Sequence, residues 1–399
     1  MKPIFYRKVL ANGMTILFEK RELPVVSVAF AVRNGGINEP VSEKGISHFI
    51  EHMLYKGTPT RDAKKIAEEI EKKGGELNGF TEETITAYWC KIPSKHLNTA
   101  LEVLSDMMKN PVFDEKELEK ERKVIFEEIK MRKDNPHIYV LDEVQDCLYN
   151  GTLGMDLIGT YETMGKINRK KIIEKFKQIY QPNNFILCIV GDADFEEIVE
   201  FAKKNFGNIK GKVPKIDFSL DNKSRTEKRK GIDQANLVFA YHVPLAKDKK
   251  SYASLVLGTL MAGGMSSRLF SEIREKRNLA YAVKGDSNIT QFFAYNTIYV
   301  GTTKENVELV KKIIIEEFKK VAIELTEEEL NQVKEQLIGN YHIYMEDSQM
   351  QMVNLLLYEI DGDAKKFYDF EKDISQVKLE DVKKLAKLKD YSFMALIPE

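Results

Sequence analysis

The chain presents one order of segments twice, with the two copies about 200 residues apart. In the first half, the apolar run VVSVAFAV is followed by the helical pattern of EKGISHFIEHMLYKG. In the second half, ANLVFAYHV and SYASLVLGTLMAGG stand in the same order. Apolar runs rich in β-branched residues predict buried strands, and apolar residues three and four apart predict helices. A repeat this long is no solenoid unit, so it predicts two domains of similar architecture.

The length of the chain and the segment between the copies favour the same division. A chain of 399 residues is too long for one ordinary domain. Residues 211–230 are polar, basic and without a hydrophobic period, which is typical of a linker. We therefore expect a first domain at residues 1–210 and a second domain at residues 231–399. Strand and helix patterns alternate in both halves, so the fold class combines α and β structure.

Composition argues against several classes of partner and site. The 61 Lys and Arg residues nearly balance the 62 Asp and Glu residues, so the net charge of -1 gives no global attraction to nucleic acid or to an anionic membrane. No segment offers the roughly 20 apolar residues of a membrane span, and no signal-peptide core is visible. Cys90, Cys147 and Cys188 are far apart and lack CxxC spacing, which argues against disulfides and a sulfur-ligated metal. We expect a cytoplasmic protein.

Two histidines and a glutamate interrupt the apolar helix pattern of the first half. His48 and His52 are four residues apart, which on a helix places their Cβ atoms about 6 Å apart on one face, close enough to bind one metal ion. Glu51 lies beside that face, where it could act as a base on a water molecule at the metal. The alternative is a pair of surface histidines, but the apolar neighbours Phe49 and Ile50 argue against it. The second copy has no His or Glu at these positions.

A catalytic zinc usually has three protein ligands, so the pair of histidines requires a further ligand. The helical segment ELEKERKVIFEEIKMR supplies Glu121 and Glu128, which are seven residues apart on one face. Glu128 could complete the ligand set, and Glu121 could accept a hydrogen bond from a ligand histidine. Taken alone, this highly charged helix is better explained as one whose glutamates face water.

Together these segments resemble the pitrilysin family of inverzincin zinc peptidases, family M16, which includes the mitochondrial processing peptidases and the core subunits of the bc1 complex. Its motif is H-x-x-E-H followed by a glutamate about 75 residues later, and Glu128 stands 76 positions after His52. The resemblance extends over GGELNGFTEETITAYW, LIGTYETMGKINRKKIIEKFKQIYQPNNFILCIVGDAD and GGMSSRLFSEIREKRNLAYAV, and so covers essentially the whole chain. Gly79 replaces the family's usual alanine, and TLGMDLIGT lacks its usual His-Pro.

The resemblance implies an α+β fold of two homologous domains, each a mainly antiparallel sheet flanked by helices, that together form half of a clamshell. Two such halves enclose a chamber in which peptides are cut. We therefore expect a homodimer with an active site shared between subunits. A catalytic subunit that works only with a degenerate partner is an alternative that one sequence leaves open.

The resemblance also assigns roles to residues. It implies one zinc ion per subunit, bound by His48, His52 and Glu128, with Glu51 as the general base and Glu121 as the hydrogen-bond partner of a ligand. The substrate would pair as an added strand with Asn78, Gly79, Phe80 and Thr81, although Asn78 could be only a turn residue. Arg274 and Tyr281 would bind the substrate and stabilise the oxyanion. Without the resemblance they would be a helix charge and a strand residue.

The expected activity is thus zinc-dependent endopeptidase cleavage of unfolded peptides or short polypeptides inside a closed chamber. The rival hypothesis is a non-catalytic or partner-dependent core subunit of the same fold. Family members of that kind usually lose part of the zinc motif or the Arg and Tyr, and this sequence keeps all of them. Hydrolysis of a substrate other than a peptide is a third alternative, which the match at the substrate strand makes less favoured.

Overall fold

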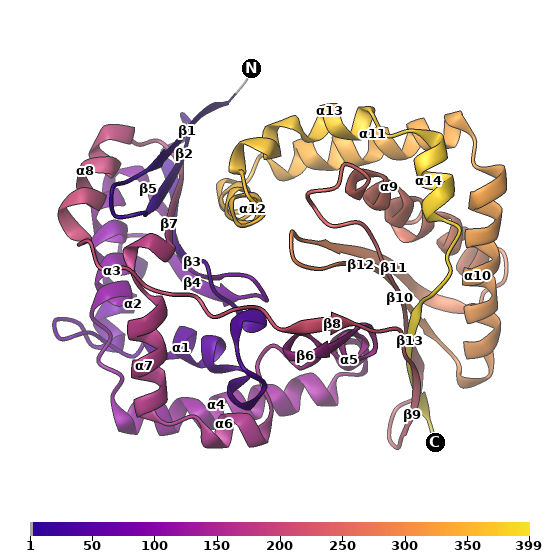
Figure 1. The fold of residues 1–399 in the computed structure, drawn as a ribbon, viewed down its shortest axis with the longest axis horizontal. Helices are drawn as coiled ribbons and strands as arrows, with labels where there is room; N and C mark the ends of the chain where they lie inside the picture. The colour runs from indigo at the N-terminus through magenta and orange to yellow at the C-terminus, as the bar shows by residue number, and fades with distance from the viewer. Residues whose placement is uncertain (1–2) are drawn as a thin grey trace. The chain divides into compact units, whose positions relative to one another are not determined.

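A computed structural model describes residues 3–399, which fall into two compact units (Figure 1). Unit 1 comprises residues 3–130, residues 155–218 and residues 344–367. Its strands and helices are β1 (Ile4–Val9), β2 (Thr15–Lys20), β3 (Val25–Val32), α1 (Ile46–Leu54), α2 (Ala63–Glu71), β4 (Glu76–Thr81), β5 (Thr86–Pro93), α3 (Leu97–Lys109), most of α4 (Glu115–Asp134), α6 (Tyr161–Lys166), α7 (Arg169–Ile179), β7 (Phe185–Gly191), α8 (Phe195–Asn205) and α12 (Ser348–Ile360).

Unit 2 comprises residues 131–154, residues 219–343 and residues 368–399. Its elements are α5 (Pro136–Leu148), β6 (Tyr149–Gly151), β8 (Phe218–Leu220, which begins at the boundary), β9 (Ser224–Arg229), β10 (Ala235–His242), α9 (Ser251–Ala262), a π-helical turn (Phe270–Glu275), β11 (Ala280–Ile289), β12 (Ala294–Thr302), α10 (Val307–Glu324), α11 (Glu327–Tyr344), α13 (Phe370–Ser375), α14 (Leu379–Leu385) and β13 (Ser392–Pro398).

The sheet of unit 1 has the strand order β1-β2-β7-β3-β5-β4. β2 and β7 pair in parallel, and the other neighbours pair antiparallel. β4 stands at the edge, so one row of its backbone groups is not used by the sheet. An edge of this kind is where an extended peptide adds as a further strand.

The two faces of this sheet have different covers. Helices α1 and α3 pack on the face to which Val26 and Val28 of β3 point. Side chains alternate across a strand, so the intervening Ser27 points to the other face. There its hydroxyl lies 2.9 Å from the hydroxyl of Ser348, at the start of α12. The helix α12, drawn in yellow in Figure 1, therefore covers the second face of the first sheet although it lies late in the chain.

A buried carboxylate holds α12 to this sheet. Glu359 is only 2% exposed, and its carboxylate accepts hydrogen bonds from Arg7 Nε and Arg33 Nη2, each at 2.8 Å. Burial by itself would raise the pKa of Glu359, but the hydrogen bonds and charges of the two arginines outweigh burial and the pKa is lowered. A buried carboxylate without a partner would be strongly destabilising, so α12 has to pack where Arg7 and Arg33 reach Glu359.

Unit 2 repeats this plan with the strand order β11-β12-β10-β13-β9. Here α9 and α10 pack on one face, and α5, from the first half of the chain, packs on β10 and β13. The hydroxyl of Ser392 in β13 donates to the carbonyl of Cys147 in α5 at 2.8 Å. Each half of the chain thus supplies one helix to the sheet of the other half.

Two features go beyond the division into two domains and a linker that the sequence predicts. Part of the expected linker 211–230 forms β8 and β9, and β9 pairs in parallel with β13. The sequence of β9, SRTEKR, has no apolar alternation from which a strand could be predicted. The strand is held instead by backbone pairing and by the ion pairs of Arg225 with Glu143 and Asp146. The exchange of α5 and α12 depends on tertiary packing, which local patterns do not encode. The expected boundaries themselves stay a prediction.

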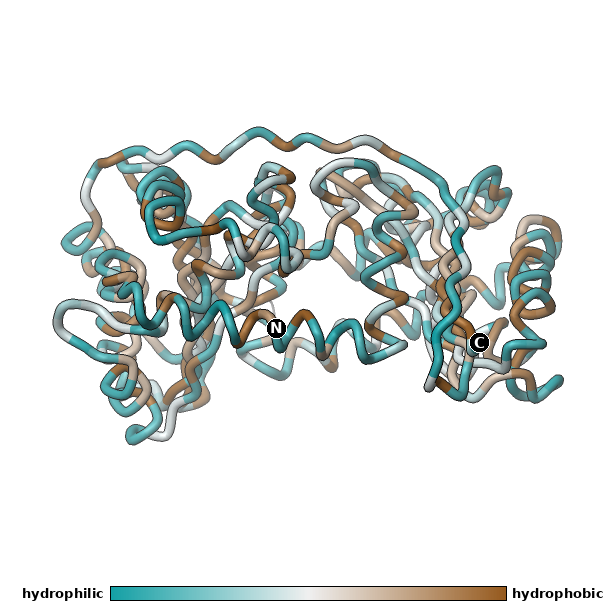
Figure 2. The backbone as a smooth tube through the Cα atoms, turned by 90° about the horizontal axis from the view of Figure 1, so that it is seen from below, coloured by the Kyte–Doolittle hydropathy of each residue, from teal (hydrophilic) through white to brown (hydrophobic). Residues whose placement is uncertain are grey.

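The local predictions agree closely with the observed elements. The helical pattern of EKGISHFIEHMLYKG, residues 43–57, contains α1, which begins at Ile46. The expected strands VVSVAFAV and ANLVFAYHV correspond to β3 and β10, and the expected helices SYASLVLGTLMAGG and ELEKERKVIFEEIKMR correspond to α9 and α4. Figure 2 shows peripheral helices that alternate between hydrophilic and hydrophobic residues along their length, as expected for helices with one face on a sheet.

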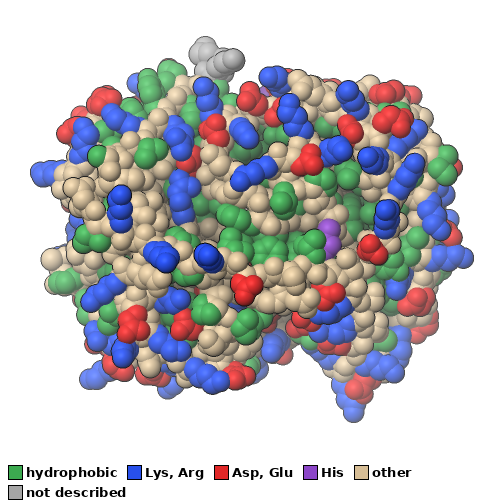
Figure 3. Space-filling model, in the orientation of Figure 1, with side chains coloured by type: hydrophobic (Ala, Val, Ile, Leu, Met, Phe, Trp, Pro, Cys, Tyr) green, Lys and Arg blue, Asp and Glu red, His purple; other side chains and the backbone are tan. Residues whose placement is uncertain are grey.

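The surface carries both signs of charge. Lys and Arg side chains are interspersed with Asp and Glu over the face drawn in Figure 3, which matches the nearly neutral net charge. Within residues 3–399, none of the helices combines the length and the apolar character needed to cross a bilayer.

Candidate metal centre

The helix α1 carries His48, Glu51 and His52, and a buried carboxylate fixes its first turn. Glu39 Oε2 accepts from the backbone N–H of Gly45 at 2.8 Å, and Glu39 Oε1 accepts from the N–H of Ser47 at 2.6 Å. These are N–H groups that a helix cannot satisfy itself, and a negative charge there is favourable. Gly45 has φ +94°, a left-handed conformation that favours glycine.

A buried ion pair lies directly beneath this turn. Lys44 is fully buried, and its Nζ lies 3.1 Å from Glu83 Oε2. Burial raises the pKa of Glu83 to about 7; Lys44 opposes the shift, while nearby Glu39 and Glu82 add to it. At the base of α1, the ammonium group of Lys44 therefore pairs with Glu83, and its charge also acts on the second buried carboxyl group, that of Glu39.

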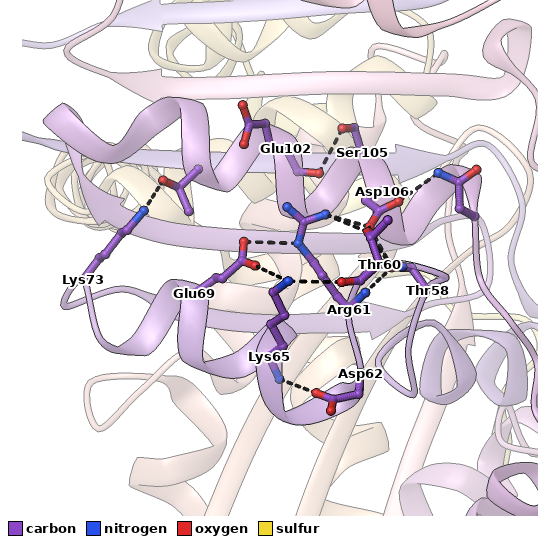
Figure 4. Close-up of polar contacts among 12 residues, drawn as sticks. Thr58, Thr60, Arg61, Asp62, Lys65, Glu69, Lys73, Glu102, Ser105 and Asp106 are labelled. Carbon is purple, nitrogen blue, oxygen red and sulfur yellow. Dashed lines mark hydrogen bonds and ion pairs between the residues drawn. The ribbon is translucent and has the colours of Figure 1, made fainter.

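The loop that follows α1 is held by a second polar cluster (Figure 4). Arg61 donates through Nη1 to Asp106 Oδ2 at 2.7 Å and through Nε to Glu69 Oε2 at 3.1 Å. The hydroxyls of Thr58 and Thr60 donate to the same Asp106 oxygen at 2.7 Å and 3.0 Å. Both ends of α1 are therefore anchored to the rest of unit 1 by specific hydrogen bonds.

The two histidines of α1 and Glu128 of α4 meet in space. His48 Nε2 and His52 Nε2 lie 3.2 Å apart, and Glu128 Oε2 lies 3.6 Å from the first and 3.8 Å from the second. In a tetrahedral zinc site with Zn–N distances of about 2.0–2.1 Å, two ligand nitrogens stand about 3.3 Å apart. The three atoms converge at nearly that spacing, so this His-His-Glu group could hold a metal ion.

The expected outer partner of the histidines is also in place. Glu121 Oε2 lies 3.1 Å from His52 Nδ1, which leaves His52 Nε2 facing His48 and Glu128. Lys56 Nζ lies 2.6 Å from Glu121 Oε1. Burial would raise the pKa of Glu121, but the hydrogen bonds from His52 and Lys56 outweigh it, so the pKa is lowered. An ionised Glu121 fixes the ring orientation and the tautomer of His52.

Glu51 lies between the edge strand β4 and the group formed by His48, His52 and Glu128, which we call the metal group. It is 9% exposed, and Glu51 Oε2 accepts a hydrogen bond of 2.5 Å from the Thr81 hydroxyl of β4. Burial raises the pKa of Glu51; Thr81 and His52 oppose the shift, and the charge of Glu128 adds to it. A carboxyl group poised in this way between a metal group and a strand edge can serve as a general base.

The expected substrate segment forms β4 itself. Asn78 is exposed, and its Oδ1 accepts from the N–H of the next residue, Gly79, at 2.8 Å. Phe80 and Thr81 are half-buried and pair with β5. The four residues therefore lie on an edge strand beside Glu51, and their contact with a substrate stays a prediction.

Arg274 and Tyr281 lie in unit 2. Arg274 belongs to the π-helical turn and Tyr281 to the start of β11. The Arg274 Cζ lies 5.0 Å from the centre of the Tyr281 ring, and Tyr281 is 79% exposed. The structure thus brings these two hydrogen-bond donors together at the surface of unit 2.

Sequence reasoning missed several residues that support the centre. Lys56 follows His52 by four residues, so helical spacing could have pointed to it. Glu39 could not be found in this way, because it caps α1 from a preceding turn. Tyr55 has a buried hydroxyl near Glu51, and only the tertiary structure reveals it.

Comparison with known proteins identifies the family. Residues 15–161 match the model for Insulinase (Peptidase family M16), and residues 166–337 match the model for the Peptidase M16 inactive domain. The uncharacterized zinc protease YmxG of Bacillus subtilis is 31% identical over 404 residues, which cover 98% of each chain. The chain belongs to peptidase family M16. An uncharacterized zinc protease of Rickettsia bellii is 33% identical over 87% of this chain and 85% of its own.

Solved structures show the same M16 fold. A protease from Helicobacter pylori superposes with a TM-score of 0.91 at 24% identity, covering 99% of this chain and 100% of its own. A chain of complex III2 from Candida albicans gives a TM-score of 0.88 at 16% identity, covering 98% of this chain and 95% of its own. The chain therefore has the two-domain M16 architecture of mixed helices and sheets that its sequence resembles.

Proposed function

We propose that this M16 chain is a zinc-dependent endopeptidase that cleaves unfolded peptides or short polypeptides inside a closed chamber. The observation that carries the proposal is the convergence of His48, His52 and Glu128 beside Glu51 and an edge strand. A metal-binding group, a base and a strand edge with which a peptide can pair are together suited to metal-dependent peptide hydrolysis.

Each residue has a role that follows from its position. His48, His52 and Glu128 would hold one zinc ion per subunit, and such an ion supplies Lewis acidity toward the scissile carbonyl. Glu51 takes a proton from the attacking water and gives it to the leaving amine. Thr81 holds Glu51 by its hydrogen bond, and the peptide pairs with β4 through its main chain, so recognition tolerates many side chains.

The chamber and the second pair of donors belong to the same proposal. Arg274 and Tyr281 would bind the peptide and donate toward the oxyanion, for which a guanidinium and a phenol are suited. We infer a homodimer in which the first domain of one subunit faces the second domain of its partner. Two subunits would then form two composite sites.

Cleavage of defined substrates by zinc-loaded protein tests the proposal. Unstructured peptides of some tens of residues should be cut, whereas a disulfide-locked globular protein should resist because it cannot present an extended strand. Glu51→Gln should keep its zinc and lose turnover by at least about 100-fold. Glu71→Gln, at an exposed position of α2, should behave as the wild type. Full turnover in Glu51→Gln rejects Glu51 as the base, and efficient cleavage of the locked protein rejects the closed chamber.

The second candidate function is a non-catalytic core subunit, and the superposition on the complex III chain favours it only at the level of the fold. Metal content separates the two candidates. A purified chain that neither binds zinc nor cuts any peptide in a mixed library supports the non-catalytic role.

A further inference from the structure

The Tyr55 hydroxyl is buried and has no hydrogen-bond partner within residues 3–399. Burial of an unpaired hydroxyl costs about 1–3 kcal/mol, and native proteins avoid it. The aromatic ring would pack equally well as phenylalanine, so packing does not explain the oxygen. Tyr55 follows Glu51 by four residues, which places the two side chains on the same side of the helix.

Gly79 in β4 marks where this hydroxyl lies. A methyl group at Gly79 would stand 2.5 Å from Tyr55 Oη, 2.9 Å from the carbonyl oxygen of Ala87 and 3.3 Å from Glu51 Oε1. The Tyr55 and Glu51 oxygens therefore both lie close to Gly79 in β4. The contact with Tyr55 is far shorter than ordinary van der Waals distance, so an alanine would displace the phenol. The glycine that stands in place of the family's usual alanine therefore leaves room for the Tyr55 hydroxyl as well as for the Ala87 carbonyl.

The neighbours of Tyr55 leave its hydroxyl available to Glu51. The hydroxyls of Tyr88 and Tyr180 lie 2.8 Å apart and form a hydrogen bond with each other. Burial, assisted by the charge of Glu51, raises the pKa of Tyr55 well above its usual range, so the phenol keeps its proton and remains a donor. Glu51 uses Oε2 to accept from Thr81, and Oε1 is the oxygen that faces Gly79.

We propose that Tyr55 is a positioning residue for Glu51, and that its hydroxyl donates to Glu51 Oε1 opposite Thr81 when the carboxylate rotates during the reaction. The terminal torsion of a glutamate is broad, so this rotation needs little energy. Two donors, one to each oxygen, then hold the base toward the peptide. The proposal rests on the proposed role of Glu51 as the general base.

The phenylalanine variant separates this role from a structural one. Tyr55→Phe should lower kcat about tenfold, the effect of one hydrogen bond, with KM and zinc content unchanged. The melting temperature of the chelator-treated variant should be equal to or higher than that of the wild type, because the variant removes an unpaired buried oxygen. Unchanged kcat, or a fall in kcat that only follows a loss of zinc or of stability, overturns the proposal.

The pairing of Tyr55 with Gly79 has its own test. Gly79→Ala should lower both kcat and the melting temperature, and both losses should be smaller when Tyr55→Phe is already present, because the nearer of the two oxygens that the methyl meets is gone while the Ala87 carbonyl remains. Additive effects of the two substitutions overturn the pairing. A zinc-loaded wild type that cuts no peptide rejects the proposed function, whereas an active wild type matched by Tyr55→Phe rejects only the role of Tyr55.

Discussion

At the scale of single residues, the metal group depends on spacings that a helix imposes. His48 and His52 are one helical turn apart, so any helix over this segment brings their side chains together. Glu128 could not be chosen from the sequence by physics alone, since the same helix carries Glu121 and Glu127 at comparable positions. The family register selected Glu128, and the structure shows why: Glu128 is half-buried against the histidines, whereas Glu127 is exposed.

The first prediction compares these neighbouring glutamates. Glu128→Gln should lose most of its zinc after dialysis against a chelator, because an amide is a poor ligand and two histidines rarely hold catalytic zinc alone. Glu127→Gln is the matched control and should retain zinc as the wild type does. Metal analysis of the three purified proteins measures the effect. Equal zinc content in both variants would place the third ligand elsewhere.

The second prediction concerns the hydrogen bond behind His52. Glu121→Gln keeps the shape of the side chain but removes the charge that orients the imidazole, so zinc affinity should fall about 10–100-fold without being abolished. Competition with a chromogenic chelator gives the affinity. Glu115→Gln, exposed in the first turn of the same helix, should leave it unchanged. An affinity for Glu121→Gln within twofold of the wild type would contradict the role of Glu121.

At the scale of elements, the helices and strands near the centre could be predicted, but the contacts that hold them could not. The apolar period gave α1 to within a turn, and Asp62 caps α2 by accepting from the N–H of Lys65 at 2.7 Å, as its residue type suggests. The carboxylate of Glu39 and the ion pair of Lys44 with Glu83 depend on side chains from separate segments. Local patterns carry no information on such pairings, and they missed β9 for the same reason.

The third prediction follows from Glu83 beneath α1. Its pKa is about 7 in the folded protein and about 4.3 in an unfolded chain. The folded state therefore binds more protons between these values, so this group's contribution to stability is full below about pH 4.3 and is lost as the pH rises through about 7. The free energy of unfolding of the wild type should fall from pH 5 to pH 8 by about 1–3 kcal/mol more than that of Glu83→Gln.

Denaturant unfolding of chelator-treated protein measures this difference, since chelation removes any contribution from metal binding. Glu76→Gln, at an exposed position of β4, is the control and should follow the wild-type profile. Parallel pH profiles for the wild type and Glu83→Gln would contradict this prediction. They would show that Lys44 keeps Glu83 ionised over the whole pH range, so that burial does not raise the pKa of Glu83.

At the scale of the whole molecule, the repeated order of segments in the sequence predicted two domains of similar architecture, and the structure contains two sheets of similar plan. The exchange of α5 and α12 between the halves could not be predicted from the sequence, because the sequence pattern does not say which sheet each helix covers. The zinc-binding motif lies only in the first half, and Arg274 and Tyr281 lie only in the second. This division of residues between homologous halves is what makes a site shared between subunits testable.

The last prediction concerns that shared site. A Glu51→Gln subunit and a Tyr281→Phe subunit should each be inactive or nearly so alone. If Tyr281 acts on the partner's metal centre, a mixed dimer contains one site in which Glu51 and Tyr281 are both intact. Random exchange makes half of the dimers mixed, and one of their two sites is intact, so activity should recover to about one quarter of the wild type. If Tyr281 acts within its own subunit, every site in the mixed dimer has a defect. Absence of recovery, with subunit exchange verified by mass spectrometry of differently tagged chains, would reject the shared site.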